Sequence, residues 1–506
     1  MLAAVTSFAI DGVETRRVTV ECDIRLGLPG FTVVGLADKS VREARERVRS
    51  AITNSGFEFP QKRITVNLAP AYLRKEGPHF DLPLAIAVLA ASGQLEAAAL
   101  ADCAVAGELS LEGELRAIRG ALALGEATRR HGLDRLLLPH DRASEAALVA
   151  GLGVLGVRTL REAVDVLRGE LVAPVPAAVA THAANDDEPG VDLADVRGHN
   201  AIIAPVKVAV AGGHNLLLHG PPGTGKTMLA RRIPTLLPPL TGDEAIEVTK
   251  IHSIAGLHTG GGLVAERPFR APHHMISASG LVGGGATPTP GEVTLAHRGV
   301  LFLDELSEFN RAALESLRQP LEDGRVVVVR SQRVLVFPTR CMLVGATNPC
   351  PCGLGGEDCR CSGADLARHQ RRLSGPLLDR LDISLAVNRP TGAGMRDQAA
   401  PSSASVRAEV VAARERQTRR LAGSGATCNA EMTPAMLREI AAITPSARRL
   451  LFEAHDTQGL TARGHHRVLR IARTIADLQG SELAGPEHVA SALAMRTEPE
   501  TAAVAA

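Results

Sequence analysis

The feature that most constrains this chain is the segment GPPGTGKT at residues 220–227, which follows an apolar run and precedes a helix-like run. A glycine-rich loop between a strand and a helix points its backbone N–H groups at phosphate oxygens, and the positive end of the helix adds to their field. In such a loop Lys226 reaches the β- and γ-phosphates, and Thr227 is a magnesium ligand. A chance glycine-rich turn is the alternative, but the flanking strand and helix argue against it, so we predict that ATP and Mg²⁺ bind here. The predicted nucleotide-binding residues are Gly220, Pro221, Pro222, Gly223, Thr224, Gly225, Lys226, Thr227 and Met228.

Two later apolar runs end in polar residues that suit the same site. Residues 299–303 lead into Asp304 and Glu305, and residues 342–344 lead toward Asn348. Runs without charge suit the central strands of a parallel sheet that is covered on both faces. We expect Asp304 to hold magnesium through water, Glu305 to activate the attacking water and Asn348 to orient that water. Taken singly, two acids at a strand exit or an asparagine in a turn would mean little.

The chain has 506 residues, which is too long for one core, and shifts in composition divide it. The N-terminal part alternates strand-like and helix-like runs, and its helix at 82–89 is apolar on nearly every side, so we expect that helix to be buried. Stretches rich in Pro, Gly, Ala and Ser interrupt the pattern twice, as interdomain linkers do. The predicted parts are a domain at 1–170, a linker at 171–190, a domain at 191–390, a linker at 391–405 and a helical domain at 406–496.

Composition excludes several classes of function. Aromatic residues make up 2% of the chain and Trp is absent, which disfavours nucleic-acid binding by base stacking. The net charge is +1, so any contact with DNA must be local. No apolar run reaches the ~18 residues of a membrane span, and we expect a cytoplasmic protein with no membrane partner.

Four of the eight cysteines crowd together at Cys350, Cys352, Cys359 and Cys361. Four thiolates can surround one tetrahedral zinc ion, although two C-x-C pairs are tighter than the usual zinc-finger spacing. The sequence leaves two interpretations open, a structural Zn²⁺ site and four reduced thiols in a glycine-rich loop.

Five further motifs resemble those of the magnesium-chelatase-like AAA+ ATPases, in particular the YifB/ComM family, and the resemblance covers almost the entire chain. The motifs are DVRGH at 195–199, PFRAPHH at 268–274, GEVTLAHRGVLFLDE at 291–305, NPCPCG at 348–353 and LSGPLLDRLD at 373–382. The resemblance implies an α/β fold in three parts. These are an N-terminal Lon-protease-like α+β domain of the ribosomal S5 domain 2 type, a P-loop AAA+ domain with a parallel αβα sheet, and an all-α C-terminal lid.

The same resemblance implies roles for one asparagine and two arginines. Asn348 matches the residue called sensor 1, Arg380 matches the arginine finger that acts on a neighbouring subunit's γ-phosphate, and Arg463 matches sensor 2, although Arg467 is close enough to be confused with it. An arginine finger that reaches a neighbouring subunit implies a ring, usually a homo-hexamer, and it can neutralise charge that develops on the phosphoryl group. Without the family pattern, a surface ion pair of Arg380 with a neighbouring aspartate would be favoured.

Two segments match inserts that face the ring pore in this family. Residues 257–287 match the helix-2 insert, and residues 324–336 match the pre-sensor-1 hairpin. Arg325, Arg330 and Arg333 could contact DNA phosphates there, and a solvated hairpin edge protected by charge is the alternative. For His273 and His274, a role in a loop is favoured over metal binding.

The N-terminal region resembles the Lon protease fold but lacks its catalytic dyad. His79 stands where the nucleophilic serine would be, and Leu122 stands at the position of the lysine base. Because a Ser/Lys mechanism needs both an activated hydroxyl and a base, we expect no proteolysis.

The resemblance implies a hexameric DNA translocase and helicase that drives branch migration when incoming DNA is integrated by homologous recombination during natural transformation. Branched or single-stranded DNA would be its partner, contacted through the pore loops. The alternative is a metal-chelatase motor subunit that acts on a protein partner carrying a metal-binding domain.

Overall fold

The computed structural model describes residues 2–174, 191–258, 260–285, 289–330, 333–372, 375–392, 396 and 400–496. The chain divides into two compact units. The first contains Met1–Ala183 and Gly242–Ala265, and the second contains Ala184–Thr241 and Glu266–Ala506. Most of the predicted linker at 171–190 lies outside the described residues. Among the described helices, none combines the length and apolar character needed to cross a bilayer.

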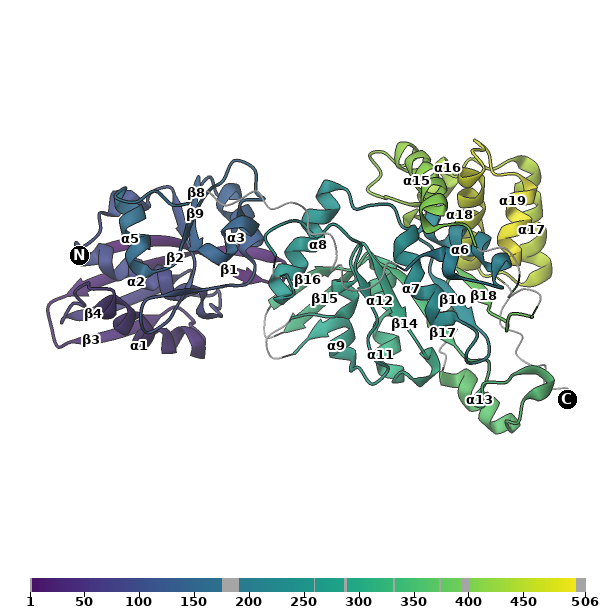
Figure 1. Ribbon diagram of the computed structural model, residues 1–506, viewed down its shortest axis with the longest axis horizontal. Coiled ribbons are helices and arrows are strands. Elements are labelled where there is room, and N and C mark those ends of the chain that lie inside the picture. Colours follow the sequence, from purple (N-terminus) through teal and green to yellow (C-terminus); the bar gives the residue numbers. More distant parts are fainter. Residues whose placement is uncertain are drawn as a thin grey trace. The chain divides into compact units, whose positions relative to one another are not determined.

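A seven-stranded sheet, in the order β3-β4-β2-β1-β5-β8-β9, forms the first unit (Figure 1). Strand β1 is antiparallel to β2, and β1, β5, β8 and β9 run parallel to one another. The strands are β1 (Leu2–Asp11), β2 (Glu14–Arg25), β3 (Gly30–Val34), β4 (Arg63–Ala69), β5 (Cys103–Val105), β8 (Arg135–Pro139) and β9 (Gly153–Val157), and β6 (Glu108–Leu109) pairs with β7 (Leu115–Arg116). The helices are α1 (Lys39–Asn54), α2 (Asp81–Ala91), α3 (Ala121–Arg130), α4 (Ala143–Ala146) and α5 (Leu160–Arg168).

The helix expected to be buried is α2, and every one of its residues is buried. Its sequence offers no polar face, so it can be stable only inside a core. Its one charged residue, Asp81, accepts hydrogen bonds of 2.7 and 2.9 Å from the guanidinium of Arg47, which compensates the buried carboxylate. The prediction for this helix is confirmed.

Helix α8 (Gly242–Ala255) belongs to the first unit, although the chain on both sides of residues 242–265 belongs to the second. Lys250 forms an ion pair of 2.5 Å with Glu126 of α3. Ser253 accepts a hydrogen bond of 2.9 Å from the backbone N–H of Gly120 and donates one to the buried carboxylate of Glu145. The predicted domains are continuous along the chain and therefore do not assign residues 242–265 to the first unit.

The second unit contains a five-stranded parallel sheet in the order β11-β14-β17-β10-β18. Its strands are β10 (Leu216–His219), β11 (Phe269–Arg270), β14 (Val300–Leu303), β17 (Met342–Thr347) and β18 (Ile383–Ala386). All residues of β14 and β17 are buried, as the apolar runs predicted. The chain is therefore an α/β protein with a mixed N-terminal sheet, a parallel central sheet and a helical C-terminal region.

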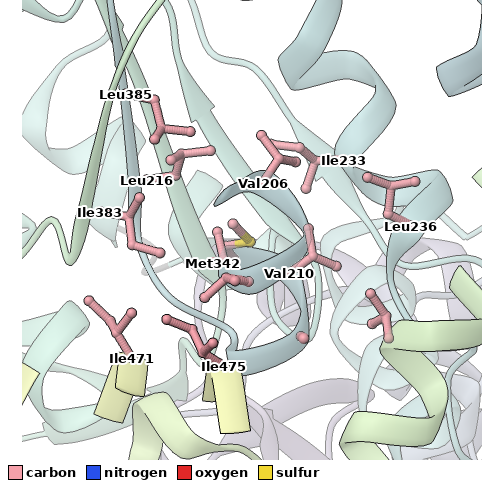
Figure 2. Packing of buried hydrophobic residues seen from close by; sticks show 14 of the residues in the cluster. Val206, Val210, Leu216, Ile233, Leu236, Met342, Ile383, Leu385, Ile471 and Ile475 are labelled. Carbon is pink, nitrogen blue, oxygen red and sulfur yellow. The ribbon is translucent and has the colours of Figure 1, made fainter. Parts of the chain in front are cut away.

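Helices from distant parts of the sequence share the core of the second unit. Figure 2 shows Val206 and Val210 of α6 (Asn200–Gly212) packed with Ile471 and Ile475 of α18 (Ala462–Leu478), beside side chains of the central sheet. The C-terminal helices are α15 (Ser403–Arg420), α16 (Pro434–Ile440), α17 (Pro445–Gln458), α18 (Ala462–Leu478) and α19 (Pro486–Ala494). The remaining elements include α7 (Lys226–Leu236), α9 (Ala278–Val282), α10 (Glu292–Leu295), α11 (Arg311–Ser316), α12 (Arg318–Asp323), α13 (Gly363–Arg372) and α14 (Gly375–Leu378), the paired strands β12 (Gly283–Gly284) and β13 (Thr289–Pro290), and the hairpin β15 (Arg325–Arg330) and β16 (Arg333–Pro338).

Candidate nucleotide site

Three neighbouring strands of the central sheet end at the same edge. Because β10 and β14 both run parallel to β17, Gly220, Asp304 and Asn348 follow strand ends that lie side by side. In open parallel sheets, ligands bind beyond the carboxyl ends of the strands. The sheet order therefore brings the glycine loop, the acidic pair and the asparagine to one place.

The glycine loop leads directly into α7, which begins at Lys226. Gly225 has φ 90°, a left-handed conformation that favours glycine. A Cβ on Gly220 would lie 2.2 Å from the carbonyl oxygen of Val387, so a larger residue there would force the backbone to move. The loop thus depends on glycine for both its turn and its close packing against the chain that follows β18.

Lys226 is the centre of the hydrogen bonding in this loop. Its Nζ donates to the carbonyl oxygens of Gly220 and Pro221 at 2.7 and 2.8 Å and to Oδ1 of Asn348 at 3.1 Å. Burial lowers the pKa of Lys226, and the charge of Asp304 opposes that shift. The ammonium therefore links the glycine loop to the end of β17.

Thr227 and Asp304 form the second link across the site. The Thr227 hydroxyl donates a hydrogen bond of 2.7 Å to Oδ2 of Asp304. A hydroxyl and a carboxylate are the hard oxygen ligands that Mg²⁺ prefers. These two residues fit the predicted magnesium site.

Glu305 has a backbone conformation that is unusual for its residue type. Its φ is 51°, and its N–H donates to Oδ1 of Asp304 at 2.9 Å. Left-handed conformations of residues other than glycine cluster at functional sites, where the surrounding structure holds them. The Glu305 carboxylate lies 3.6 Å from Nδ1 of His274, so this histidine is a site residue that the sequence did not indicate. His274 follows β11, which neighbours β14 in the sheet, and no pattern in the sequence shows that order.

The two predicted catalytic arginines share one carboxylate. Arg380 Nη2 lies 2.5 Å from Oε2 of Glu322, and Arg463 Nη2 lies 2.9 Å from Oε1 of the same residue. Arg380 also donates from Nε to the carbonyl oxygen of Arg318 at 3.0 Å, and only 14% of its side chain is exposed, compared with 56% for Arg463. Arg467, the competing candidate for sensor 2, is buried and lies 3.5 Å from Asp382. Arg380 and Arg463 thus both contact α12, whereas Arg467 contacts Asp382, and none of these contacts joins the arginines to Lys226.

The four clustered cysteines follow Asn348 directly, and all are free. Their sulfur atoms all lie within 4.8 Å of one another. The four sulfur atoms are therefore gathered around one point, where they could hold a metal ion. The sequence left open whether they bind zinc or remain reduced thiols.

The two predictions of pore segments have different outcomes in the structure. The hairpin is confirmed, since β15 and β16 pair antiparallel and Arg325 is exposed. The tip at 331–332 and the side chains of Arg330 and Arg333 lie outside the described residues. The prediction that all of 257–287 is an insert is wrong for β11, which is a strand of the central sheet. Within β11, Arg270 forms hydrogen bonds of 2.6 and 2.8 Å with Glu292.

In the N-terminal unit, both residues at the expected protease positions are buried. His79 Nε2 lies 3.0 Å from the carbonyl oxygen of Phe8, and burial lowers the pKa of His79 to about 4. Leu122 is 1% exposed. A neutral core histidine and a core leucine replace the two groups that a Ser/Lys dyad would need.

Three protein-family models match successive parts of the chain. The family model described as "Magnesium chelatase, subunit ChlI" matches residues 192–395, the model described as "Subunit ChlI of Mg-chelatase" matches 20–142, and the C-terminal model of the same subunit matches 400–496. Together with the phosphate loop and the parallel sheet, these matches define a magnesium-chelatase-like AAA+ ATPase.

Similarity to individual proteins narrows the class. The chain is 42% identical over 500 residues to YifB of Escherichia coli, with 98% of this chain and 97% of that protein covered. It is 42% identical over 503 residues to the competence protein ComM of Haemophilus influenzae, with the same coverage of both chains. A magnesium-chelatase 38 kDa subunit of Acidiphilium rubrum is 26% identical over 321 residues, which are 57% of this chain and 83% of that protein. The chain belongs to the YifB/ComM family, and membership implies ATPase activity.

Proposed function

We propose that this chain is an ATP-driven DNA motor that works as a ring of six and drives branch migration during homologous recombination of incoming DNA. The observation that carries the ATP-hydrolysing part is the meeting of three strand ends, where Lys226 contacts Asn348 and Thr227 contacts Asp304. Similarity to a competence protein over nearly the full chain supports the DNA part. The antiparallel hairpin supplies a segment that could contact DNA.

Each residue of the site has a distinct task in this proposal. Lys226 binds phosphate oxygens, Asn348 orients the attacking water and Glu305 takes a proton from that water. The 3.6 Å contact with His274 links the Glu305 carboxylate to the segment that follows the neighbouring strand, β11. When bound by Thr227 and Asp304, Mg²⁺ supplies positive charge to the phosphates.

Arg380 must leave Glu322 if it acts on the nucleotide of a neighbouring subunit. Its ion pair with Glu322 then competes with its contact to the neighbouring subunit's nucleotide. Because Arg463 pairs with the same carboxylate, the contacts of Arg463 change together with those of Arg380. Glu322 would therefore hold both arginines in the isolated protomer and release them when the ring forms.

Glu322→Gln is expected to lower the protein concentration that gives half-maximal ATPase activity by up to about fivefold. A partly exposed ion pair contributes roughly 1 kcal/mol, and tenfold in an equilibrium constant corresponds to about 1.4 kcal/mol. ATP hydrolysis measured against protein concentration checks this. Asp323→Asn, an exposed neighbour that accepts from Gln319 at 3.1 Å, should leave the curve unchanged. A raised half-maximal concentration for Glu322→Gln would show that the pair does not restrain Arg380.

ATP-dependent resolution of a synthetic four-way DNA junction tests the proposed function. The wild-type chain should convert the junction to duplex products with ATP, and it should not do so without nucleotide or with Glu305→Gln. Failure to move the junction at any ATP concentration, with ATP hydrolysis intact, would contradict the DNA role.

A metal-chelatase motor is the second candidate, favoured by the three chelatase-type family matches. It predicts that a partner protein with a metal-binding domain, and not DNA, raises ATP hydrolysis. The N-terminal unit gives proteolysis no support under either candidate, because His79 and Leu122 are core residues.

A further inference from the structure

The cysteine cluster has the dimensions of a single-metal site. The separations between Sγ atoms are 3.2 Å for Cys350 and Cys352, 3.6 Å for Cys350 and Cys359, and 3.9 Å for Cys352 and Cys359. A tetrahedral zinc ion with Zn–S bonds of about 2.3 Å places its sulfur ligands about 3.8 Å apart. A disulfide would need about 2.05 Å between two sulfur atoms. The cluster is therefore too open for disulfides and close to the spacing of four thiolates around one ion.

Local backbone structure creates this arrangement from two short segments. The N–H of Gly353 donates to the carbonyl oxygen of Cys350 at 2.9 Å, which closes a turn and brings the first two sulfur atoms together. The N–H of Cys352 points at Sγ of Cys361 at 3.4 Å, which joins the second pair to the first. Among the described residues, this is the one group of three or more His, Cys, Asp or Glu side chains whose ligand atoms lie close enough together to hold a metal ion.

We propose that Cys350, Cys352, Cys359 and Cys361 bind one structural zinc ion, and that the segment from Asn348 to Cys361, here called the zinc loop, braces the nucleotide site. Four soft thiolates in a tetrahedron select zinc over the hard cations that the oxygen ligands of the nucleotide site select. All four positions are filled by protein, so the ion has no open position for catalysis. The bracing part rests on the proposed ATP function, whereas the zinc part does not.

The zinc loop adjoins two parts of the nucleotide site, the phosphate loop and Asn348. A Cβ added to Gly353, which has φ 80°, would lie 2.8 Å from Cδ of Pro222 in the phosphate loop. At the start of the zinc loop, Asn348 accepts from Lys226, and its carbonyl oxygen lies 3.1 Å from Nε2 of His369 in α13. The zinc ion would close the chain between Asn348 and α13, and so fix the asparagine and the phosphate loop relative to each other.

Zinc content of the purified full-length chain tests the metal site without reference to activity. Inductively coupled plasma mass spectrometry should find one zinc per chain and no stoichiometric iron. The double variant Cys352→Ser, Cys359→Ser should hold less than a tenth of that zinc. Cys341→Ser, which removes a thiol outside the cluster, should keep all of it. Wild-type protein that contains iron or no metal, or a double variant that keeps its zinc, would overturn the proposal.

Binding of a fluorescent ATP analogue tests the bracing. We expect the Kd to rise about tenfold when zinc is removed with a mercurial reagent and a chelator, and to recover when thiol and zinc are restored. An unchanged Kd in protein shown to have lost zinc would overturn the bracing. Failure of zinc-loaded wild type to bind the analogue would instead contradict the nucleotide site, and the zinc content would still decide the metal site.

Discussion

Lys226→Ala is expected to lower kcat for ATP hydrolysis by about 10²- to 10³-fold, the range found when one preorganised donor is removed from a site of developing charge. The Lys226 ammonium is the link between the glycine loop and Asn348, and alanine supplies neither its charge nor its hydrogen bonds. Steady-state phosphate release measures the effect. Lys207→Ala is the matched control, because Lys207 lies on α6 and pairs with Glu409 at 2.6 Å, outside the site.

Glu305→Gln separates nucleotide binding from chemistry in the same assay. An amide cannot take a proton from water, but its size and its place after Asp304 are retained. Hydrolysis should fall as far as in Lys226→Ala, while the affinity for ATP should stay within a few-fold of wild type. Wild-type turnover in either variant would place the reaction at another site.

Asp477→Ala is expected to lower the free energy of unfolding of the second unit by about 3–5 kcal/mol, the usual cost of breaking a buried ion pair. Asp477 is 1% exposed and accepts hydrogen bonds from Arg420 at 2.6 and 2.7 Å and from Arg473 at 3.0 and 3.2 Å. Asn429 adds a bond of 2.8 Å to the same carboxylate. Without Asp477, two guanidinium groups lose the charge that compensates their burial.

Urea unfolding of the full chain, followed by far-ultraviolet circular dichroism, measures the loss. Asp456→Ala on α17 is the control, because Asp456 is exposed and surface substitutions change stability by roughly 0.5 kcal/mol or less. If Asp477→Ala unfolds at the same urea concentration as this control, the network does not stabilise the packing of the C-terminal helices.

Local sequence was sufficient wherever one element carries its own signal. The uncharged runs that became β14 and β17 predict buried parallel strands, and GPPGTGKT predicts the loop before α7. Helix α2 was predictable because it has no polar face. In each case the spacing and residue types within one short segment specify the structure.

Apart from those that join the predicted nucleotide site, contacts between distant residues were not predictable. Glu322 is 58 residues from Arg380 and 141 residues from Arg463, and no local pattern connects them. His274 meets Glu305 only because β11 and β14 are neighbours in the sheet. Helix α8 joins the first unit through Ser253 and Lys250, whose partners in that unit precede them by more than a hundred residues. These features depend on sheet order and packing, which a single sequence does not show.

ATP turnover by the wild-type chain, measured with and without a synthetic four-way DNA junction, tests most directly whether a nucleotide held at the three strand ends drives movement on DNA. Turnover should be present without DNA and should rise several-fold at saturating junction. Turnover that no DNA changes would contradict the motor, and absence of turnover under both conditions would contradict the site itself.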